Sequence, residues 1–344
     1  MSKERIGYID SVKGLAVLLM VMGHVVACQF ANPDGILSNE PRSAMFLFRF
    51  IYSFHMHLLM FCSGLFALKI MDYTWKGLGQ SIWKRFYTLM VPFFCAGLVQ
   101  NLIKPNAPFD YWYLWALFQF VIAVLAIDGL CSLLPKNGEI ISTVLIVVSA
   151  ILVHLFYSKF LVYENKPLLD IGHWRFYPYF CMGVICTRYD LCGKWFSKNW
   201  VYTCALALFG LLTYVITIKG FHIPQQSITG CLLPISAIIA CVYLFKEGLA
   251  NNTSLGVRWL QDIGRHSLEI YIIHFFFLFK AYKIGGCVQK LANIDGGGQT
   301  IFFVQIVTSF VASVIIIALC YLVMNIINKS KVLSLLFLGR KSEK

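Results

Sequence analysis

The side chains that could do chemistry in this 344-residue chain are histidines and cations placed inside or beside long apolar runs. In the run that opens RIGYIDSVKG, Lys13 and His24 lie 11 residues apart. On an α-helix this spacing is three turns plus about 20°, so both side chains project from one face, about 16 Å apart along the axis. A cation at one end and an imidazole near mid-bilayer suit a long ligand with an anionic head and a reactive tail.

Both residues also have a structural interpretation, which stays open at this point. A lysine at the end of a membrane segment can extend its stem so that the ammonium reaches the headgroups. A histidine within such a segment can instead hydrogen-bond a neighbouring helix.

Two further apolar runs carry histidines. His55 and His57 are two residues apart and would point about 160° away from each other on an unbroken helix, so only one of them can face a given site. His274 lies seven residues after Ser267, on the same face. Three segments therefore place a histidine at similar depth. This pattern predicts either acid–base chemistry on a hydroxyl or thioester, or a buried metal or haem site.

Basic residues gather in the connection WKGLGQSIWKRFYTLMVP. Lys76, Lys84 and Arg85 there could bind phosphates, or they could be ordinary cytoplasmic loop charges. The preceding Ser63-Gly64 pair would allow a ligand to approach the backbone closely, although small residues also serve plain helix packing.

The composition decides which elements must position these residues. The chain is 59% hydrophobic and only 13% charged, too few charges for a water-covered globule of this size. Its apolar runs are continuous and do not alternate, which favours membrane helices over barrel strands. The net charge of +13 lies in short loops between these runs, so it indicates membrane topology and not nucleic-acid binding.

We predict an all-α, polytopic membrane protein with about ten transmembrane helices and a single domain over residues 1–344, with no appended soluble domain. The predicted segments are 12–30, 44–68, 87–103, 112–131, 140–157, 174–188, 201–219, 226–246, 267–283 and 299–327. The N-terminus, alternate connections and C-terminal tail together hold 18 Lys and Arg against 6 in the opposite connections. This bias predicts that both termini are cytoplasmic.

Five sequence elements, in order from about residue 5 to 280, resemble acyltransferase family 3, a family of bacterial integral-membrane O-acyltransferases. They are the opening D-x-x-K-G with its cation-x10-His spacing, FHMHLLMFCSG, YWYLWALF, RFYPYFCMGVIC and GRHSLEIYIIHFF. Each match is weak alone, but five in family order are specific.

The resemblance implies an O-acyltransferase of the bacterial inner membrane that moves an acyl group, most often acetyl, from cytosolic acyl-CoA to a hydroxyl of a glycan or lipid-linked sugar. By position, His24 stands at the family's essential histidine, Lys13 where arginine is common, and Arg85 at the first arginine of R-x-x-R. The second arginine is Thr88 here, with Lys84 as its substitute, and His57 replaces a proline. Many members also carry an extracytoplasmic hydrolase-like domain.

The resulting site prediction has three parts and no metal ligand. The predicted catalytic residues are His24, His55 and His274; the predicted acyl-CoA contacts are Lys13, Lys84, Arg85, Ser63 and Gly64; and the predicted substrate contacts are Asp10, Trp112, Trp115, Glu269 and Tyr271. The expected partners are acyl-CoA, the acceptor, membrane lipid and a possible second copy of the chain, with no permanently bound cofactor. A transporter or flippase for a lipid-linked glycan is the alternative, and a haem or metal protein a third interpretation.

Overall fold

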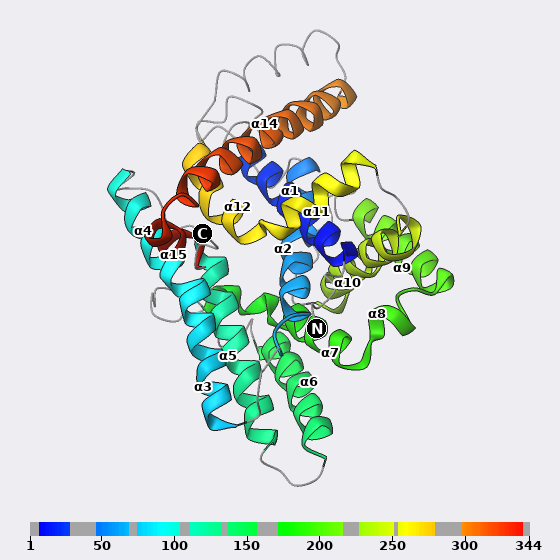
Figure 1. Ribbon diagram of the computed structural model, residues 1–344. Coiled ribbons are helices and arrows are strands. Elements are labelled where there is room, and N and C mark those ends of the chain that lie inside the picture. The colour runs from blue at the N-terminus through cyan, green and yellow to red at the C-terminus, as the bar shows by residue number, and fades with distance from the viewer. Residues whose placement is uncertain are drawn as a thin grey trace.

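The computed structural model describes most of the chain, in nine stretches (Figure 1). They are residues 7–27, 46–68, 74–103, 111–132, 137–156, 171–215, 227–250, 254–278 and 298–339. Side chains are left out at a few of these positions. The stretch 171–215 contains parts of two predicted segments. Parts of several predicted connections lie outside the described residues. So do residues 28–30, 44–45, 157, 216–219, 226 and 279–283, which belong to six predicted segments.

Every element in the described residues is helical, as the apolar runs predict. The α-helices are α1 (Gly7–Val25), α2 (Phe46–Gly64), α3 (Trp75–Arg85), α4 (Val91–Ile103), α5 (Trp112–Ser132), α6 (Gly138–Phe156), α7 (Tyr177–Tyr189), α8 (Leu191–Lys194), α9 (Asn199–Thr213), α10 (Ile228–Tyr243), α11 (Leu255–Arg265), α12 (Ser267–Ile273), α14 (Gly298–Ile327) and α15 (Lys331–Leu338). Tighter or wider turns join them at η3 (Phe86–Met90), η5 (Ile171–Phe176), η7 (Leu244–Gly248) and η8 (His274–Phe277).

Each predicted segment overlaps one of these helices, and among the described residues seven helices are long and apolar enough to cross a membrane. They are Gly7–Val25, Phe46–Gly64, Lys76–Ile103, Trp112–Ser132, Gly138–Phe156, Gly230–Gly248 and Phe303–Ile327. Two further apolar helices, Asn199–Thr213 and Ser267–Phe277, are shorter. The all-helical membrane fold is therefore confirmed, whereas the count of ten and the orientation of the termini stay predictions.

Helix α1 lies at the centre of the molecule, between α2 and α11 (Figure 1). Two glycines let α1 and α11 cross at backbone contact. A Cβ on Gly14 would overlap the Leu260 carbonyl oxygen, and a Cβ on Gly264 would overlap the Asp10 carbonyl oxygen. Such close approach is how small residues join membrane helices, and here it fixes the helix that carries Lys13 and His24.

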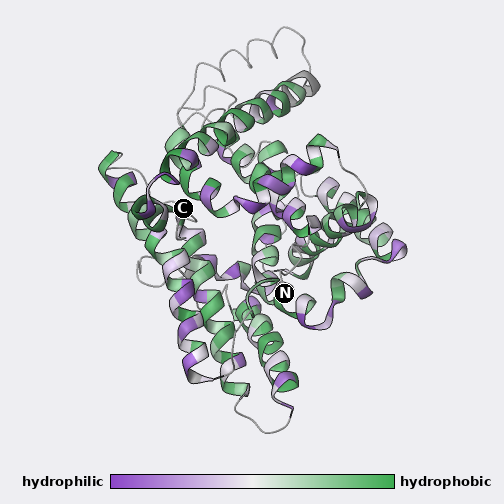
Figure 2. Cartoon of the chain, viewed as in Figure 1, coloured by the Kyte–Doolittle hydropathy of each residue, from purple (hydrophilic) through white to green (hydrophobic). Residues whose placement is uncertain are grey.

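Helix α2 is held against α7 in the same manner. A Cβ on Gly64 would overlap the Phe180 carbonyl oxygen, and one on Gly183 would overlap the Phe61 carbonyl oxygen. By contrast, α6 and α14 expose many large apolar side chains, and both are predominantly hydrophobic along their length in Figure 2. Apolar surface on this scale is ordinary where the surrounding solvent is lipid.

Candidate active site

The structure brings together the histidines of the first and ninth predicted segments. The ring centroids of His24 on α1 and His274 in η8 lie 5.3 Å apart. His274 is fully buried, whereas His24 is partly exposed. Phe275 lies against His24 at a centroid distance of 5.2 Å, and Tyr52 of α2 at 6.5 Å. We call His24 and His274 the histidine pair.

Backbone hydrogen bonding fixes the proton on His274. Its Nδ1 lies 3.0 Å from the carbonyl oxygen of Ile270, one turn earlier in α12. A carbonyl only accepts, so Nδ1 carries the hydrogen, and in the neutral ring Nε2 is left as an acceptor. That Nε2 is buried and has no hydrogen-bond partner among the described residues. The pair therefore holds one imidazole lone pair that is available to a proton or to a donor.

His55 and His57 point apart, as their spacing predicts, because α2 is unbroken through both positions. The Nδ1 of His55 donates to the Ile51 carbonyl oxygen at 2.7 Å, and its ring contacts Tyr52, whose own ring contacts His24. His57 instead packs edge-on against Phe176 and Tyr179. His55 thus lies on the side of the histidine pair, and His57 faces α7.

Tyrosines join the histidine pair to α2 and α5. Tyr271, one turn before His274, is buried, and its hydroxyl accepts the backbone N–H of Tyr113 at 3.2 Å. The Tyr113 hydroxyl lies 2.7 Å from the Ser63 hydroxyl, which donates to the Leu59 carbonyl oxygen. Ser63 is therefore part of a helix-joining network.

Two predicted acyl-CoA contacts converge at the end of α2. The Lys13 ammonium lies 5.8 Å from the centroid of the Phe66 ring. The Arg85 guanidinium donates to the carbonyl oxygen of Phe66 at 2.8 Å, and Lys84, its neighbour on α3, is exposed. We call Lys13 and Arg85 the basic mouth. The cations of α1 and α3 thus contact the same residue, Phe66, one through its ring and the other through its carbonyl oxygen.

The predicted substrate contacts are not gathered in one place. Asp10 pairs with Arg265 of α11, Oδ2 to Nε, at 3.6 Å. Trp112 stacks on His173 at a centroid distance of 3.9 Å, whereas Trp115 stacks on Phe93 of α4 at 5.9 Å. Glu269 is buried within α12. Of the five, Tyr271 is the residue whose ring lies against the histidine pair, 5.9 Å from His274.

A buried ion pair near the end of α2 was missed by the sequence analysis. Arg188 of α7 and Asp128 of α5 pair through Nη2 and Oδ1, with side chains only 7% and 4% exposed. The same guanidinium lies 2.8 Å from the Thr143 hydroxyl and 3.2 Å from that of Ser142. Asp128 interrupts an apolar run, and an ionisable residue there is the signal that could have found the pair.

A comparison with known families shows which family the chain belongs to. A family model described as an acyltransferase domain matches residues 6–325, nearly the whole chain. The chain belongs to this family, so the resemblance read from the five sequence elements is confirmed. Together with its apolar helices, this makes the chain a multi-pass membrane protein of an acyltransferase family. Searches of curated proteins and of solved structures each found no match.

The geometry supports acid–base chemistry at the histidine pair. A partly exposed imidazole beside a buried one with a free acceptor nitrogen can take a proton from a hydroxyl and pass it on. Within the described residues, no three His, Cys, Asp or Glu side chains lie close enough to hold a metal ion.

Proposed function

We propose that this protein is an O-acyltransferase that moves an acyl group, most often acetyl, from cytosolic acyl-CoA to a hydroxyl of a glycan or lipid-linked sugar. The observation that carries the proposal is the histidine pair: His24 lies on the helix that also bears Lys13 of the basic mouth, and His274 beside it has one uncommitted nitrogen. The proposed setting is the inner membrane of a bacterium, with both termini in the cytoplasm.

The donor would lie along α1. The phosphates of coenzyme A would rest on the basic mouth, where Arg85 is held in place by the carbonyl of Phe66 and Lys13 lies over the Phe66 ring. The pantetheine arm would extend along α1, about 16 Å from Lys13 to His24. The thioester would then reach the histidine pair.

At the histidine pair, His24 would act as the general base because it is the more exposed ring. Rings whose centroids lie about 5 Å apart can bring two nitrogens within about 3 Å after a small rotation. A His24 N–H could then donate to Nε2 of His274, which would leave the other His24 nitrogen aimed at the acceptor hydroxyl. His274 would be a positioning residue that stabilises the imidazolium formed during the reaction.

The chemical balance is that of direct transfer. His24 takes the proton of the acceptor hydroxyl while its oxygen attacks the thioester carbonyl. The tetrahedral intermediate then collapses, the carbon–sulfur bond breaks, and the thiolate of coenzyme A receives the proton from His24. An ester forms as the thioester is consumed. A covalent acyl-histidine is the variant of this mechanism, and it would appear as a label on His24 without acceptor present.

The test uses purified protein in nanodiscs, acetyl-CoA, a panel of free and lipid-linked sugars, and a thiol reagent that detects free coenzyme A. Wild-type protein should release coenzyme A in the presence of an acceptor, and His24→Ala should reduce the rate by about 10²- to 10⁴-fold. Equal rates in both proteins would remove His24 from the chemistry. Failure of the wild type to bind any acyl-CoA would overturn the proposal and favour the transporter alternative.

A further inference from the structure

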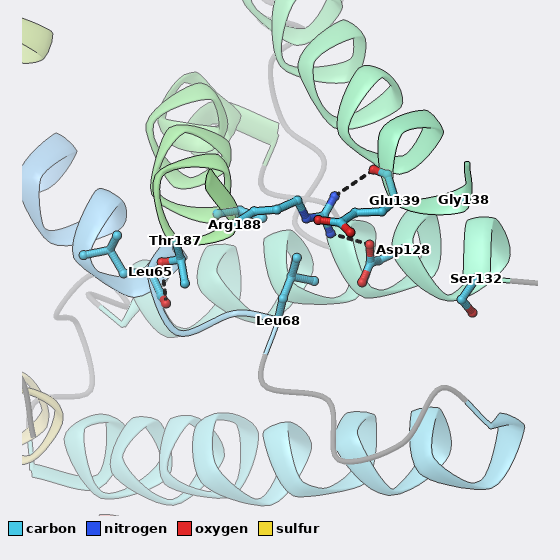
Figure 3. Close-up of a pocket in the computed structure, with 10 residues that line it drawn as sticks. Leu65, Leu68, Asp128, Ser132, Gly138, Glu139, Thr187 and Arg188 are labelled. Atoms are coloured by element: carbon cyan, nitrogen blue, oxygen red, sulfur yellow. Dashed lines mark hydrogen bonds and ion pairs between the residues drawn. The ribbon is translucent and has the colours of Figure 1, made fainter. Parts of the chain in front are cut away.

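A cavity opens beside the end of α2 (Figure 3). Its volume is about 540 Å³, within the range of small-molecule sites. The lining residues come from α2, α5, α6 and α7, and they are Gly64, Leu65, Leu68, Asp128, Ser132, Gly138, Glu139, Val184, Thr187 and Arg188. We call this space the Arg188 cavity.

A backbone contact and a hydrogen bond join the walls of the Arg188 cavity. Gly138 begins α6 in backbone contact with the end of α5, since a Cβ there would overlap the Cys131 carbonyl oxygen. Thr187 donates to the Leu65 carbonyl oxygen at 2.9 Å, which ties α7 to the last turn of α2. A cavity between elements joined in this way is a preformed site.

One polar atom of a residue that lines the cavity lacks a partner. Oδ1 of Asp128 accepts from both Arg188 and Ser142, the latter at 2.6 Å. Oδ2 of the same carboxylate is buried and has no hydrogen-bond partner among the described residues. An unpaired carboxylate oxygen is costly to bury. A ligand that donates a hydrogen bond would relieve that cost.

The charge of the cavity further restricts the ligand. Figure 3 shows Arg188 lying between Asp128 and Glu139, and its guanidinium donates to the Asp128 carboxylate, the Glu139 backbone carbonyl oxygen and the hydroxyls of Ser142 and Thr143. Arg188 and Asp128 neutralise each other, so the exposed Glu139 carboxylate leaves the lining with a net negative charge. A phosphate would be repelled there. A flat, uncharged ring with an exocyclic N–H donor would not be repelled, and it could lie between the apolar side chains of Leu65, Leu68 and Val184.

The cations of the basic mouth indicate which ligand carries that ring. Leu65 and Leu68 flank Phe66, and Phe66 carries both contacts of the basic mouth. Phosphates bound at the basic mouth would therefore contact the segment of chain, residues 65–68, that also lines the Arg188 cavity. Acyl-CoA has an aminopurine ring attached through a ribose to those phosphates.

We propose that the Arg188 cavity holds the adenine ring of the acyl-CoA donor, with the exocyclic amine donating to Oδ2 of Asp128. This inference rests on the proposed function and assigns a base-binding subsite to it. The Arg188 cavity would bind the neutral base, and the basic mouth would bind the phosphates. The two sites together would hold the nucleotide in one orientation.

The test compares three donors on the full-length protein in nanodiscs: acetyl-CoA, acetyl-1,N6-etheno-CoA and acetyl-pantetheine. The etheno bridge removes the N–H donors of adenine and leaves the phosphates intact. Wild-type protein should use acetyl-CoA with a kcat/KM about tenfold higher than the etheno analogue, the worth of one hydrogen bond to a charged group. Asp128→Asn should bring that ratio close to one, and Glu247→Gln, an exposed carboxylate elsewhere, should keep it.

A second variant guards against misfolding of Asp128→Asn. Leu68→Phe narrows the cavity without touching the ion pair, and it should raise the KM for acetyl-CoA several-fold with a smaller effect for acetyl-pantetheine. If wild-type protein used acetyl-CoA and the etheno analogue equally well, the inference would be overturned. The proposed function would still stand, because acetyl-CoA is turned over. Turnover of none of the three donors would overturn both. A thermal shift that depends on ethanolamine lipid, without discrimination between donors, would assign the cavity to a headgroup amine.

Discussion

The histidine pair and the Arg188 cavity both contain buried polar side chains, but these side chains are stabilised in different ways. At the histidine pair, the fixed ring uses a backbone carbonyl one turn away, and its surroundings are aromatic. At the cavity, a full charge pair is buried and supported by two hydroxyls on α6. The first can stay neutral in a dry environment; the second depends on both of its charges.

This difference indicates which residues mainly stabilise the fold and which mainly take part in the reaction. A neutral histidine that satisfies one nitrogen locally costs little to keep and leaves the other nitrogen available. A buried carboxylate and guanidinium must stay paired, because either one alone would be an uncompensated charge in a medium of low dielectric constant. We therefore expect substitutions at the cavity to act on folding first, and substitutions at the histidine pair to act on rate.

The largest effect is expected from Asp128→Ala. This change leaves Arg188 buried without its counter-charge, a loss of about 3–5 kcal/mol for a pair of this kind. Thermal unfolding in detergent should show a markedly lower Tm. The double variant Asp128→Leu with Arg188→Met removes both charges and should recover most of the loss. An unchanged Tm for Asp128→Ala would mean that water or lipid solvates the guanidinium.

At the histidine pair, His274→Leu should lower kcat by about 10²-fold, near 2.7 kcal/mol, with little change in KM or Tm. The reason is that His274 acts on His24 and not on the donor. His274→Gln, which keeps an acceptor in the side chain, should retain about tenfold more activity than His274→Leu. Equal activity of the two variants would contradict a positioning role through a hydrogen bond.

The positions of the helices could be predicted from the sequence, because continuous apolar runs leave little choice of structure within a bilayer. The placement of His55 and His57 on opposite faces also follows, since α2 keeps its regular period. The pairing of buried charged side chains could not be predicted from the sequence. Asp128 and Arg188 are 60 residues apart, and their pairing depends on how α5 and α7 pack.

Some predicted site residues have structural contacts that spacing alone could not show. Gly64 packs on α7, Ser63 bonds the hydroxyl of Tyr113, and Asp10 pairs with Arg265. A motif gives the identity of a residue at a position, but small and polar side chains serve packing and binding equally well. Their predicted roles in binding acyl-CoA or the acceptor stay predictions.

The rigidity of α1 gives a third way to test the comparison, because α1 carries one member of the histidine pair. Gly14→Ala places a methyl group on the Leu260 carbonyl oxygen, so α1 and α11 must separate. We expect a loss of about 1–3 kcal/mol and a lower Tm, together with a lower kcat as His24 moves. Gly210→Ala on α9 is the control, since a Cβ there meets nothing within 4 Å. Equal Tm values for both variants would show that the α1–α11 crossing is adaptable.

The smallest effects are expected at the cations. Arg85→Ala should raise the KM for acetyl-CoA about tenfold, whereas Lys84→Ala should raise it only about twofold. Arg85 is already ordered by the Phe66 carbonyl oxygen, but Lys84 is exposed, and an exposed charge is screened by salt. Measuring KM between low and physiological salt separates the two, because only the Lys84 contribution should fade strongly. A larger effect at Lys84 would move the phosphates to the open face of α3, away from both the basic mouth and the cavity.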